Sequence, residues 1–181
     1  MLINTHNSWL LIVDVQEKLI PAIHNKDVVI DHCAWLMKVS GVMGVPILVS
    51  EQYPKGLGPT VPELRELAPK DAFMEKVHFS CPAAPQCDAR ISALGRSQVV
   101  IAGIEAHVCV LQTALDLAAD GKQVFVVADA ISSRDPRDVE LAMERMRSTG
   151  VVIVSREMVL FEWAHKSGTT QFKQLSSMFL R

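Results

Sequence analysis

Short runs of β-branched apolar residues alternate along the chain with longer stretches in which apolar residues recur at helical spacing. The runs show no polar alternation, which is typical of strands buried on both faces of a parallel sheet. Parallel strands need crossover connections, usually helices, and these crossovers are almost always right-handed. The sequence therefore predicts an α/β fold: a three-layer α/β/α sandwich around a mainly parallel, doubly wound sheet.

The residues between these runs give the expected order of elements. Gly44, Gly121 and Gly150 each end a helix-like stretch just before an apolar run, as C-terminal glycines often do. The segment 53–59 is too rich in Gly and Pro for regular structure, so we expect a loop that shapes a site. We expect strands at 8–13, 47–50, 98–103, 123–128 and 151–154, a short element near 73–76, and helices at 27–43, 85–94, 105–119 and 136–147, with helical cover at 157–181.

Length and composition limit the number of domains and the classes of partner that this chain can have. The 181 residues suit one domain, 1–181, and 49% hydrophobic residues are enough to fill its core. The formal net charge is -2 and no Lys/Arg-rich block is present, so nucleic acid is not an expected partner. The apolar runs are far shorter than the roughly 20 residues that cross a bilayer. We therefore expect no membrane association.

The amino terminus and the cysteines point to a cytoplasmic protein. Residues 1–7 carry neither a basic region nor an Arg-rich amphipathic pattern, so we expect no export or import signal. Four scattered cysteines do not make a disulfide framework, and we expect reduced thiols. His78, Cys81 and Cys87 lack paired spacing and a fourth ligand, so no zinc site is expected. The fragment 56–58, with sequence GLG, is too incomplete for a phosphate loop.

Three chemically capable residues lie at or shortly after predicted strands: Asp14, Lys76 and Cys109. Ligands of open parallel sheets bind beyond the carboxyl ends of the strands. A thiol attacks as its thiolate, which a helix amino terminus and a nearby lysine favour, and a carboxylate can take the thiol proton. The three residues are candidates for base, electrostatic partner and nucleophile. On this reasoning the pKa of the thiol should lie below the free value of about 8.5.

Each of these residues also has a structural interpretation. Asp14 can cap the segment that follows it. Lys76 is by default a solvated surface cation. Cys109 can be a small buried hydrophobe near the start of a helix. The residues taken singly leave these alternatives open.

Several short motifs occur in a fixed order over nearly the whole chain. They are LIVDVQ at 11–16, Lys76 followed by Phe79 and Ser80, GIEAHVC at 103–109 with Thr113 and Ala114 after it, VADA at 127–130 and SSR at 132–134. Each motif is weak alone, but their order and spacing together are specific. In this combination the chain resembles the isochorismatase-like cysteine hydrolase family.

This resemblance implies a six-stranded parallel sheet and a catalytic triad of Asp14, Lys76 and Cys109. In such family members the aspartate deprotonates the thiol, the thiolate attacks a carbonyl, the lysine stabilises the charged state, and water hydrolyses the acyl-enzyme. A cis peptide bond is common just before the cysteine turn, here between Ile104 and Glu105. We expect the N–H groups of Glu105 and Cys109 to form an oxyanion hole. The mechanism needs no cofactor and no metal, and the resemblance points to a homo-oligomer.

The chain departs from two activities of this family. Nicotinamidases carry an Asp-x-His metal pair with a further His after the second strand, whereas this chain reads SEQYPKG at 50–56. Metal-assisted nicotinamide hydrolysis is therefore not expected. Isochorismatases cleave a vinyl ether and lack the cysteine, so Cys109 argues against that reaction. The pattern is closer to isochorismatase-domain hydrolases, for which the family supplies a mechanism without a substrate.

Four further residues are candidates for substrate binding: Gln16, Tyr53, Phe79 and His107. Phe79 can instead pack in the core, and His107 can instead pack against its neighbours at the start of the helix. Glu105 occupies a position where relatives often carry a small residue. Its side chain can take part in catalysis or can make a purely structural hydrogen bond.

The sequence therefore predicts a cytoplasmic, single-domain cysteine hydrolase that acts on a carbon–nitrogen bond of a small-molecule amide. The alternative is a non-catalytic oligomeric binding or scaffold protein of the same fold, in which Cys109 is a redox-sensitive thiol.

Overall fold

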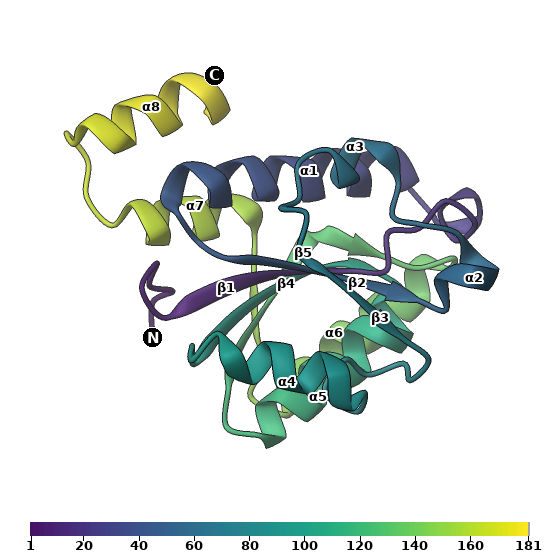
Figure 1. Cartoon of the computed structure of the whole chain (residues 1–181). Helices are drawn as coiled ribbons and strands as arrows, with labels where there is room; N and C mark the ends of the chain where they lie inside the picture. The colour runs from purple at the N-terminus through teal and green to yellow at the C-terminus, as the bar shows by residue number, and fades with distance from the viewer. Residues whose placement is uncertain (181) are drawn as a thin grey trace.

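Six strands form one sheet in the computed structural model, which describes residues 1–180 (Figure 1). Every neighbouring pair is parallel, and the order across the sheet is β3-β2-β1-β4-β5-β6. The prediction of a six-stranded parallel sheet is confirmed. The strands are β1 (Ser8–Val13), β2 (Ile47–Gln52), β3 (Phe73–Lys76), β4 (Gln98–Ile104), β5 (Gln123–Ser132) and β6 (Val152–Val154).

Helices cover both faces of the sheet and complete the predicted three-layer sandwich. One face carries α1 (Lys26–Met43) and α7 (Arg156–Ala164), with α8 (Thr170–Phe179) packed against α1 on the outer side, and the other face carries α4 (Pro85–Ala93), α5 (Leu111–Ala119) and α6 (Pro136–Ser148) (Figure 1). Alternate residues of a strand point to opposite faces, so each face has its own apolar core. In β1, Leu10 and Ile12 pack in the core beside α1, and Leu11 and Val13 pack in the core beside α4 and α5.

The loop after β2 contains more regular structure than the sequence analysis expects. Within the segment 53–59, α2 (Pro54–Leu57) forms a single helical turn, and α3 (Pro62–Arg65) forms another shortly after it. Both turns begin with a proline, whose fixed φ suits the first helical position and whose missing N–H leaves no bond unmade there. The expectation of purely irregular structure is therefore wrong, because the prolines initiate helix here.

Element ends also differ from the sequence-based expectations. Strand β2 continues to Gln52 and β5 continues to Ser132, because polar residues at their carboxyl ends are buried and still pair with neighbouring strands. The expected helical cover consists of α7 and α8, and the last residue assigned to it, 181, lies outside the described residues. No helix within residues 1–180 is long and apolar enough to cross a membrane.

The two central strands approach each other closely at their carboxyl ends. Strands β1 and β4 are neighbours, but the strands that follow them lie on opposite sides, so the switch point of the sheet falls between them. Gly103 pairs with Val13 and has a φ of 115°. A Cβ at Gly103 would lie 2.2 Å from the Val13 carbonyl oxygen. Only glycine allows β4 to run this close to the strand that ends at Asp14.

We expect Gly103→Ala to lower the free energy of unfolding by about 3–5 kcal/mol, because both overpacking and the positive φ oppose the added methyl group. Gly95→Ala is the matched control, since Gly95 also has a positive φ but no atom lies within 4 Å of its added Cβ. That control should cost only about 1–2 kcal/mol. Urea unfolding of the three proteins measures both losses, and equal losses would contradict the close approach.

Candidate active site

Asp14 lies at the switch point of the sheet, directly after β1. Its backbone has a φ of 50°, and its side chain is fully buried. Oδ1 accepts a hydrogen bond from Ser50 Oγ at 2.7 Å, and Oδ2 lies 2.7 Å from Lys76 Nζ. A buried carboxylate needs such partners to offset its lost hydration. The carboxylate is therefore part of a buried polar cluster, and the interpretation of Asp14 as a capping residue is wrong.

Lys76 is the last residue of β3 and is only 2% exposed. Its ammonium group donates to Asp14 Oδ2 and to Gln52 Oε1, both at 2.7 Å. Burial acts to lower the pKa of Lys76, but the negative charge and hydrogen bond of Asp14, with further electrostatic interactions with Cys109 and Cys81, outweigh it, so this pKa lies above its ordinary value. Lys76 is therefore a buried cation at neutral pH, and the interpretation as a solvated surface residue is wrong.

Cys109 lies in a π-helical turn, η2 (Ala106–Val110), between β4 and α5. Its side chain is 6% exposed and packs in the same core as Val13. Burial raises the pKa of the Cys109 thiol most strongly, the charge and hydrogen bonding of Asp14 raise it further, and those of Lys76 lower it. The expectation of a pKa below 8.5 is therefore wrong, because the opposite charges of Asp14 and Lys76 offset each other and burial keeps the proton on sulfur.

The turn that precedes the thiol carries the predicted cis peptide bond, between Ile104 and Glu105. The Glu105 carbonyl accepts hydrogen bonds from the N–H groups of Val108 and Val110. The second of these bonds closes the wide π-helical turn, a geometry that is frequent at functional sites. The Glu105 side chain bonds Arg134, with 2.9 Å between Oε2 and Nε. Glu105 thus makes a structural hydrogen bond, and a role for its N–H in an oxyanion hole stays a prediction.

Two of the candidate substrate-binding residues form hydrogen bonds with neighbouring residues. Gln16 is fully buried, and its side-chain amide bonds the backbone of Gln52 and the carbonyl of Gly58. His107 is partly exposed, and its Nδ1 lies 2.9 Å from Ser133 Oγ. Their contact with a substrate stays a prediction.

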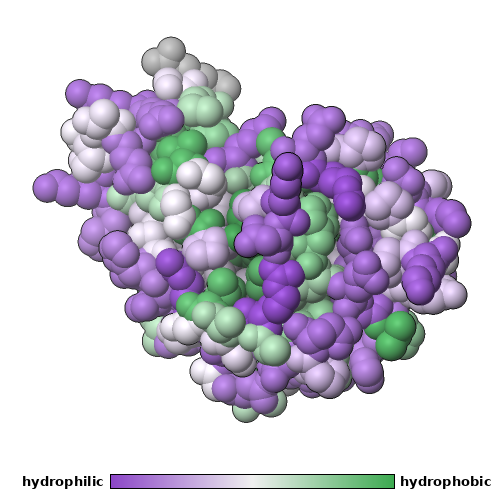
Figure 2. Space-filling view, viewed as in Figure 1, coloured by the Kyte–Doolittle hydropathy of each residue, from purple (hydrophilic) through white to green (hydrophobic). Residues whose placement is uncertain are grey.

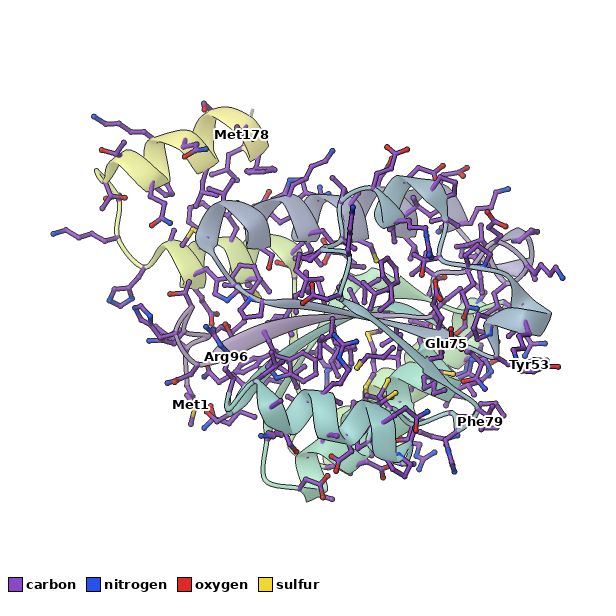
Figure 3. The ribbon with its side chains drawn as sticks, in the orientation of Figure 1. Met1, Tyr53, Glu75, Phe79, Arg96 and Met178 are labelled. Carbon is purple, nitrogen blue, oxygen red and sulfur yellow. The ribbon has the colours of Figure 1, made fainter. Side chains whose placement is uncertain are left out.

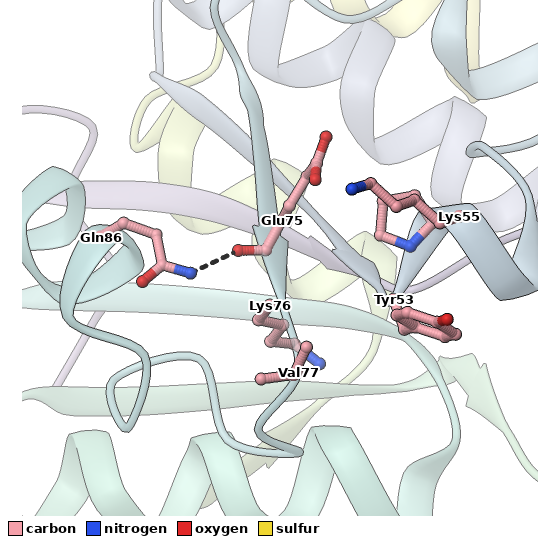
Figure 4. Close-up of a pocket in the computed structure, with 7 residues that line it drawn as sticks. Tyr53, Lys55, Glu75, Lys76, Val77 and Gln86 are labelled. Atoms are coloured by element: carbon pink, nitrogen blue, oxygen red, sulfur yellow. Dashed lines mark hydrogen bonds between the residues drawn. The ribbon is translucent and has the colours of Figure 1, made fainter.

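The other two candidates, Tyr53 and Phe79, are exposed at the carboxyl edge of the sheet (Figure 3). Apolar atoms stand out at the same edge in the space-filling view, at its lower right (Figure 2). A cavity of about 250 Å³ opens beside Tyr53, and Lys76 forms part of its wall (Figure 4). The other lining residues are Pro54, Lys55, Glu75, Val77 and Gln86. Of Asp14, Lys76 and Cys109 only Lys76 lines this cavity, whose volume suits a small molecule.

Ser50 and Gln52 belong to the polar cluster, and the sequence analysis did not identify them. In the parallel register Ser50 pairs with Val13 and Gln52 pairs with Lys76. The available signal is that both residues are polar, two positions apart, and follow an apolar run that ends beside β1. Two positions apart in a strand means one face. Their importance follows only once the order of the strands is known.

Within residues 1–180, no three His, Cys, Asp or Glu side chains are arranged to hold a metal ion. Cys81 instead packs against α5, with its N–H donating to Thr113 Oγ1 at 3.0 Å. Burial, aided by the charge of Asp14, raises the pKa of the Cys81 thiol to about 11. Cys33, Cys81, Cys87 and Cys109 are all free thiols.

Comparison with known proteins places this constellation in a family. The model of the isochorismatase domain matches residues 8–158, a range that includes Asp14, Lys76 and Cys109. The chain belongs to the isochorismatase domain family. It is 39% identical over 166 residues to isochorismatase domain-containing protein 1 of Danio rerio, a match that covers 91% of this chain but only 58% of that protein. It is 37% identical over 180 residues to isochorismatase domain-containing protein 2A of Mus musculus, covering 95% of this chain and 82% of that protein.

Solved structures of the same fold include proteins with different descriptions. A Caenorhabditis elegans protein described as MAR1 ribonuclease superposes with a TM-score of 0.93 at 35% identity, covering 100% of this chain and 93% of that chain. The Escherichia coli YcaC gene product, described as an octameric hydrolase of unknown specificity, superposes with a TM-score of 0.89 at 23% identity, covering 98% and 90%. At that identity the likeness to YcaC shows the fold alone. The fold of this family member is thus one that hydrolases use.

Proposed function

We propose that the protein hydrolyses a carbon–nitrogen bond of a small amide, with Cys109 as nucleophile, Asp14 as base and Lys76 as electrostatic partner. The observation that carries the proposal is the fully buried Asp14–Lys76 pair, whose two members both act on the Cys109 thiol. A buried ion pair is a costly way to stabilise a fold. Its presence beside a barely exposed thiol at the switch point favours a chemical role.

In the first half-reaction the Cys109 sulfur attacks the amide carbonyl carbon while Asp14 takes the thiol proton. Because burial holds the proton on the resting sulfur, deprotonation accompanies the attack. Negative charge develops on the carbonyl oxygen, where the N–H groups of Glu105 and Cys109 are proposed to stabilise it. The carbon–nitrogen bond then breaks, Asp14 returns the proton to the leaving nitrogen, and a thioester stays on Cys109.

In the second half-reaction water hydrolyses this thioester. Asp14 takes a proton from the water molecule as its oxygen attacks the thioester carbonyl. The carbon–sulfur bond breaks, the carboxylic acid leaves, and the proton held by Asp14 returns to the sulfur. Lys76 stays protonated throughout and offsets the negative charge that passes between Asp14, the substrate oxygen and the sulfur.

Amides suit this site better than the RNA substrate suggested by the description of the Caenorhabditis elegans relative. A thiol nucleophile with a general base is the chemistry of acyl transfer. The chain carries a net charge of -2, whereas RNA binding draws on positively charged surfaces. The cavity beside Lys76 has a volume of about 250 Å³, which suits a small molecule rather than a polymer.

The test is a panel of primary amides, with ammonia release followed by acid quench and peptide mass spectrometry. We expect the Cys109 peptide to gain the mass of the acyl group, and the Cys109→Ala variant to show neither adduct nor turnover. Cys33→Ala is the matched control, because Cys33 is a buried thiol in the core on the opposite face of the sheet. Ammonia release by Cys109→Ala at the wild-type rate would refute the proposal, and saturable binding of a panel member without turnover would favour the binding protein.

We further propose that the protein is a cytoplasmic homo-oligomer. The support is the exposed apolar group of Tyr53, Val77 and Phe79 at the carboxyl edge of the sheet, where exposed fractions are 54%, 69% and 52%. The octameric description of Escherichia coli YcaC concerns a protein of the same fold. Sedimentation velocity of the purified chain tests the assembly, and a monomer at every concentration would contradict it.

A further inference from the structure

Gln52 is a buried glutamine with an unusual set of partners. It is the last residue of β2 and is only 8% exposed. Its Oε1 accepts a hydrogen bond from Lys76 Nζ at 2.7 Å, and its Nε2 donates to the carbonyl of Val77 at 2.9 Å. A buried amide must satisfy both its ends. The bond to the Val77 carbonyl therefore fixes which way the amide lies, with its oxygen toward Lys76.

The side chain of Gln16 forms two hydrogen bonds with the backbone of Gln52. Gln16 Oε1 accepts a hydrogen bond from the Gln52 N–H at 2.7 Å, and Gln16 Nε2 donates to the Gln52 carbonyl at 3.0 Å. Nε2 also donates to the carbonyl of Gly58 at 2.7 Å. We call this pair the glutamine clasp. Since Gln16 follows Asp14 by two residues, the clasp joins the segment that carries the base to the strand that faces Lys76.

The clasp determines how the Lys76 ammonium group is shared. An ammonium group has three N–H donors. One goes to Asp14 and one goes to Gln52, each at 2.7 Å. The remaining donor is then available to the Cys109 sulfur, on which Lys76 acts, or to a substrate oxygen. Without Gln52 the Lys76 ammonium group would lose this hydrogen bond and keep its bond to the Asp14 carboxylate, so it would shift toward Asp14 and away from the Cys109 sulfur.

We propose that Gln52 is a positioning residue, which holds the Lys76 ammonium group between the Asp14 carboxylate and the Cys109 thiol. This inference rests on the proposed function, since it assigns a role in preparing that thiol. Gln52 acts through Lys76, because its side-chain amide bonds Lys76 and the Val77 carbonyl and makes no hydrogen bond to Cys109. By drawing one N–H away from Asp14, it also leaves carboxylate lone pairs available for the thiol proton.

The test is the rate of Cys109 alkylation by iodoacetamide between pH 6 and pH 10.5, read by peptide mass spectrometry. We use Gln52→Met, which keeps the length of the side chain and removes the amide. We expect the inflection to move upward by about one pH unit and the rate at pH 7.5 to fall about 10-fold, because Lys76 no longer favours the thiolate.

Gln98→Met is the matched control. Gln98 is also a buried glutamine with both ends of its amide bonded, since its Oε1 accepts from the Asn4 N–H at 2.7 Å and its Nε2 donates to the Leu2 carbonyl at 3.1 Å, but it lies at the start of β4, at the opposite end of the sheet from Lys76. We expect this variant to keep the wild-type inflection. Should Gln52→Met fail to fold by circular dichroism, Gln16→Met removes the clasp and leaves the Gln52 amide in place. It should move the inflection in the same direction by a smaller amount.

The alkylation rate of Cys109 in Lys76→Met distinguishes failure of the Gln52 proposal from failure of the electrostatic role proposed for Lys76. If Lys76→Met slows alkylation and Gln52→Met leaves both rate and inflection unchanged, the positioning role of Gln52 is overturned while the proposed function stands. If Lys76→Met itself leaves the reactivity of Cys109 unchanged, the electrostatic role of Lys76 fails, and the role of Gln52 fails with it.

Discussion

We expect Asp14→Asn to lower kcat for amide hydrolysis by a factor of about 10⁴, the upper end of what a positioned general base contributes. The asparagine keeps the shape of the side chain and one accepting oxygen, which can take the bond from Ser50 or from Lys76, but it cannot take the thiol proton. Because burial holds that proton on the resting sulfur, loss of the base removes the group that takes the proton during the attack and returns it to the leaving nitrogen.

Ser50→Ala is the control for this effect, since it removes a hydrogen bond to Asp14 Oδ1 and leaves the carboxylate. Loss of one hydrogen bond to a charged group is worth about 1.5–3 kcal/mol at most, so we expect a decrease of about 10-fold to 100-fold. Steady-state ammonia release with the best amide of the panel measures both variants. Equal losses for Asp14→Asn and Ser50→Ala would mean that Asp14 acts only through its place in the polar cluster.

We expect Lys76→Met to lower the free energy of unfolding by about 3–5 kcal/mol at pH 7, because it leaves the Asp14 carboxylate buried without its cation. Nζ and Oδ2 are 2.7 Å apart, and both side chains are fully buried. Arg137→Met is the matched control, since Arg137 pairs with Glu140 at the same distance on an exposed helix surface. We expect that variant to cost less than about 1 kcal/mol. Urea unfolding measures both, and equal losses would contradict the burial of the Asp14–Lys76 pair.

The difference in the free energy of unfolding between the wild type and Lys76→Met depends on pH because the pKa of Lys76 is raised. A cation with a pKa above its unfolded value stabilises the folded state below the unfolded pKa, about 10.4, and loses this contribution as the pH rises through the folded pKa. We therefore expect the gap in stability between the wild type and Lys76→Met to be constant from pH 7 to pH 9. It should narrow only above about pH 10.4.

The three candidate catalytic residues could be located from the sequence because their placement depends mainly on topology. Asp14 and Lys76 follow or end parallel strands, whose carboxyl ends meet at one edge of a sheet, and Cys109 follows a third strand. Apolar runs mark the strands before Asp14 and Cys109 without knowledge of side-chain contacts, whereas the short stretch 73–76 before and including Lys76 carries no such run. The cis bond before Glu105 was predicted from the family resemblance rather than from any local pattern.

The features that the sequence does not predict depend on the pairing of strands and on burial in the folded chain. Gln52 matters because it pairs with Lys76 across the β2–β3 register, which no local pattern reveals. The helical turn at Pro54 depends on a proline that the composition of the loop marks only as a breaker. The direction of the Cys109 pKa depends on the balance between burial and two opposite charges, and this balance exists only in the folded chain.

The measurement that tests the central claim most directly is the pH dependence of Cys109 alkylation in the wild type and in Asp14→Asn. We expect an inflection above the free-thiol value of about 8.5 in the wild type. In Asp14→Asn the inflection should fall, and alkylation at pH 7.5 should become faster, because Lys76 then acts on the sulfur without the opposing carboxylate. If Asp14→Asn is alkylated faster than the wild type and has also lost amide hydrolysis, Asp14 acts as the base for the Cys109 thiol. An unchanged inflection in Asp14→Asn would contradict this account, because Asp14 and Cys109 would then not act on each other.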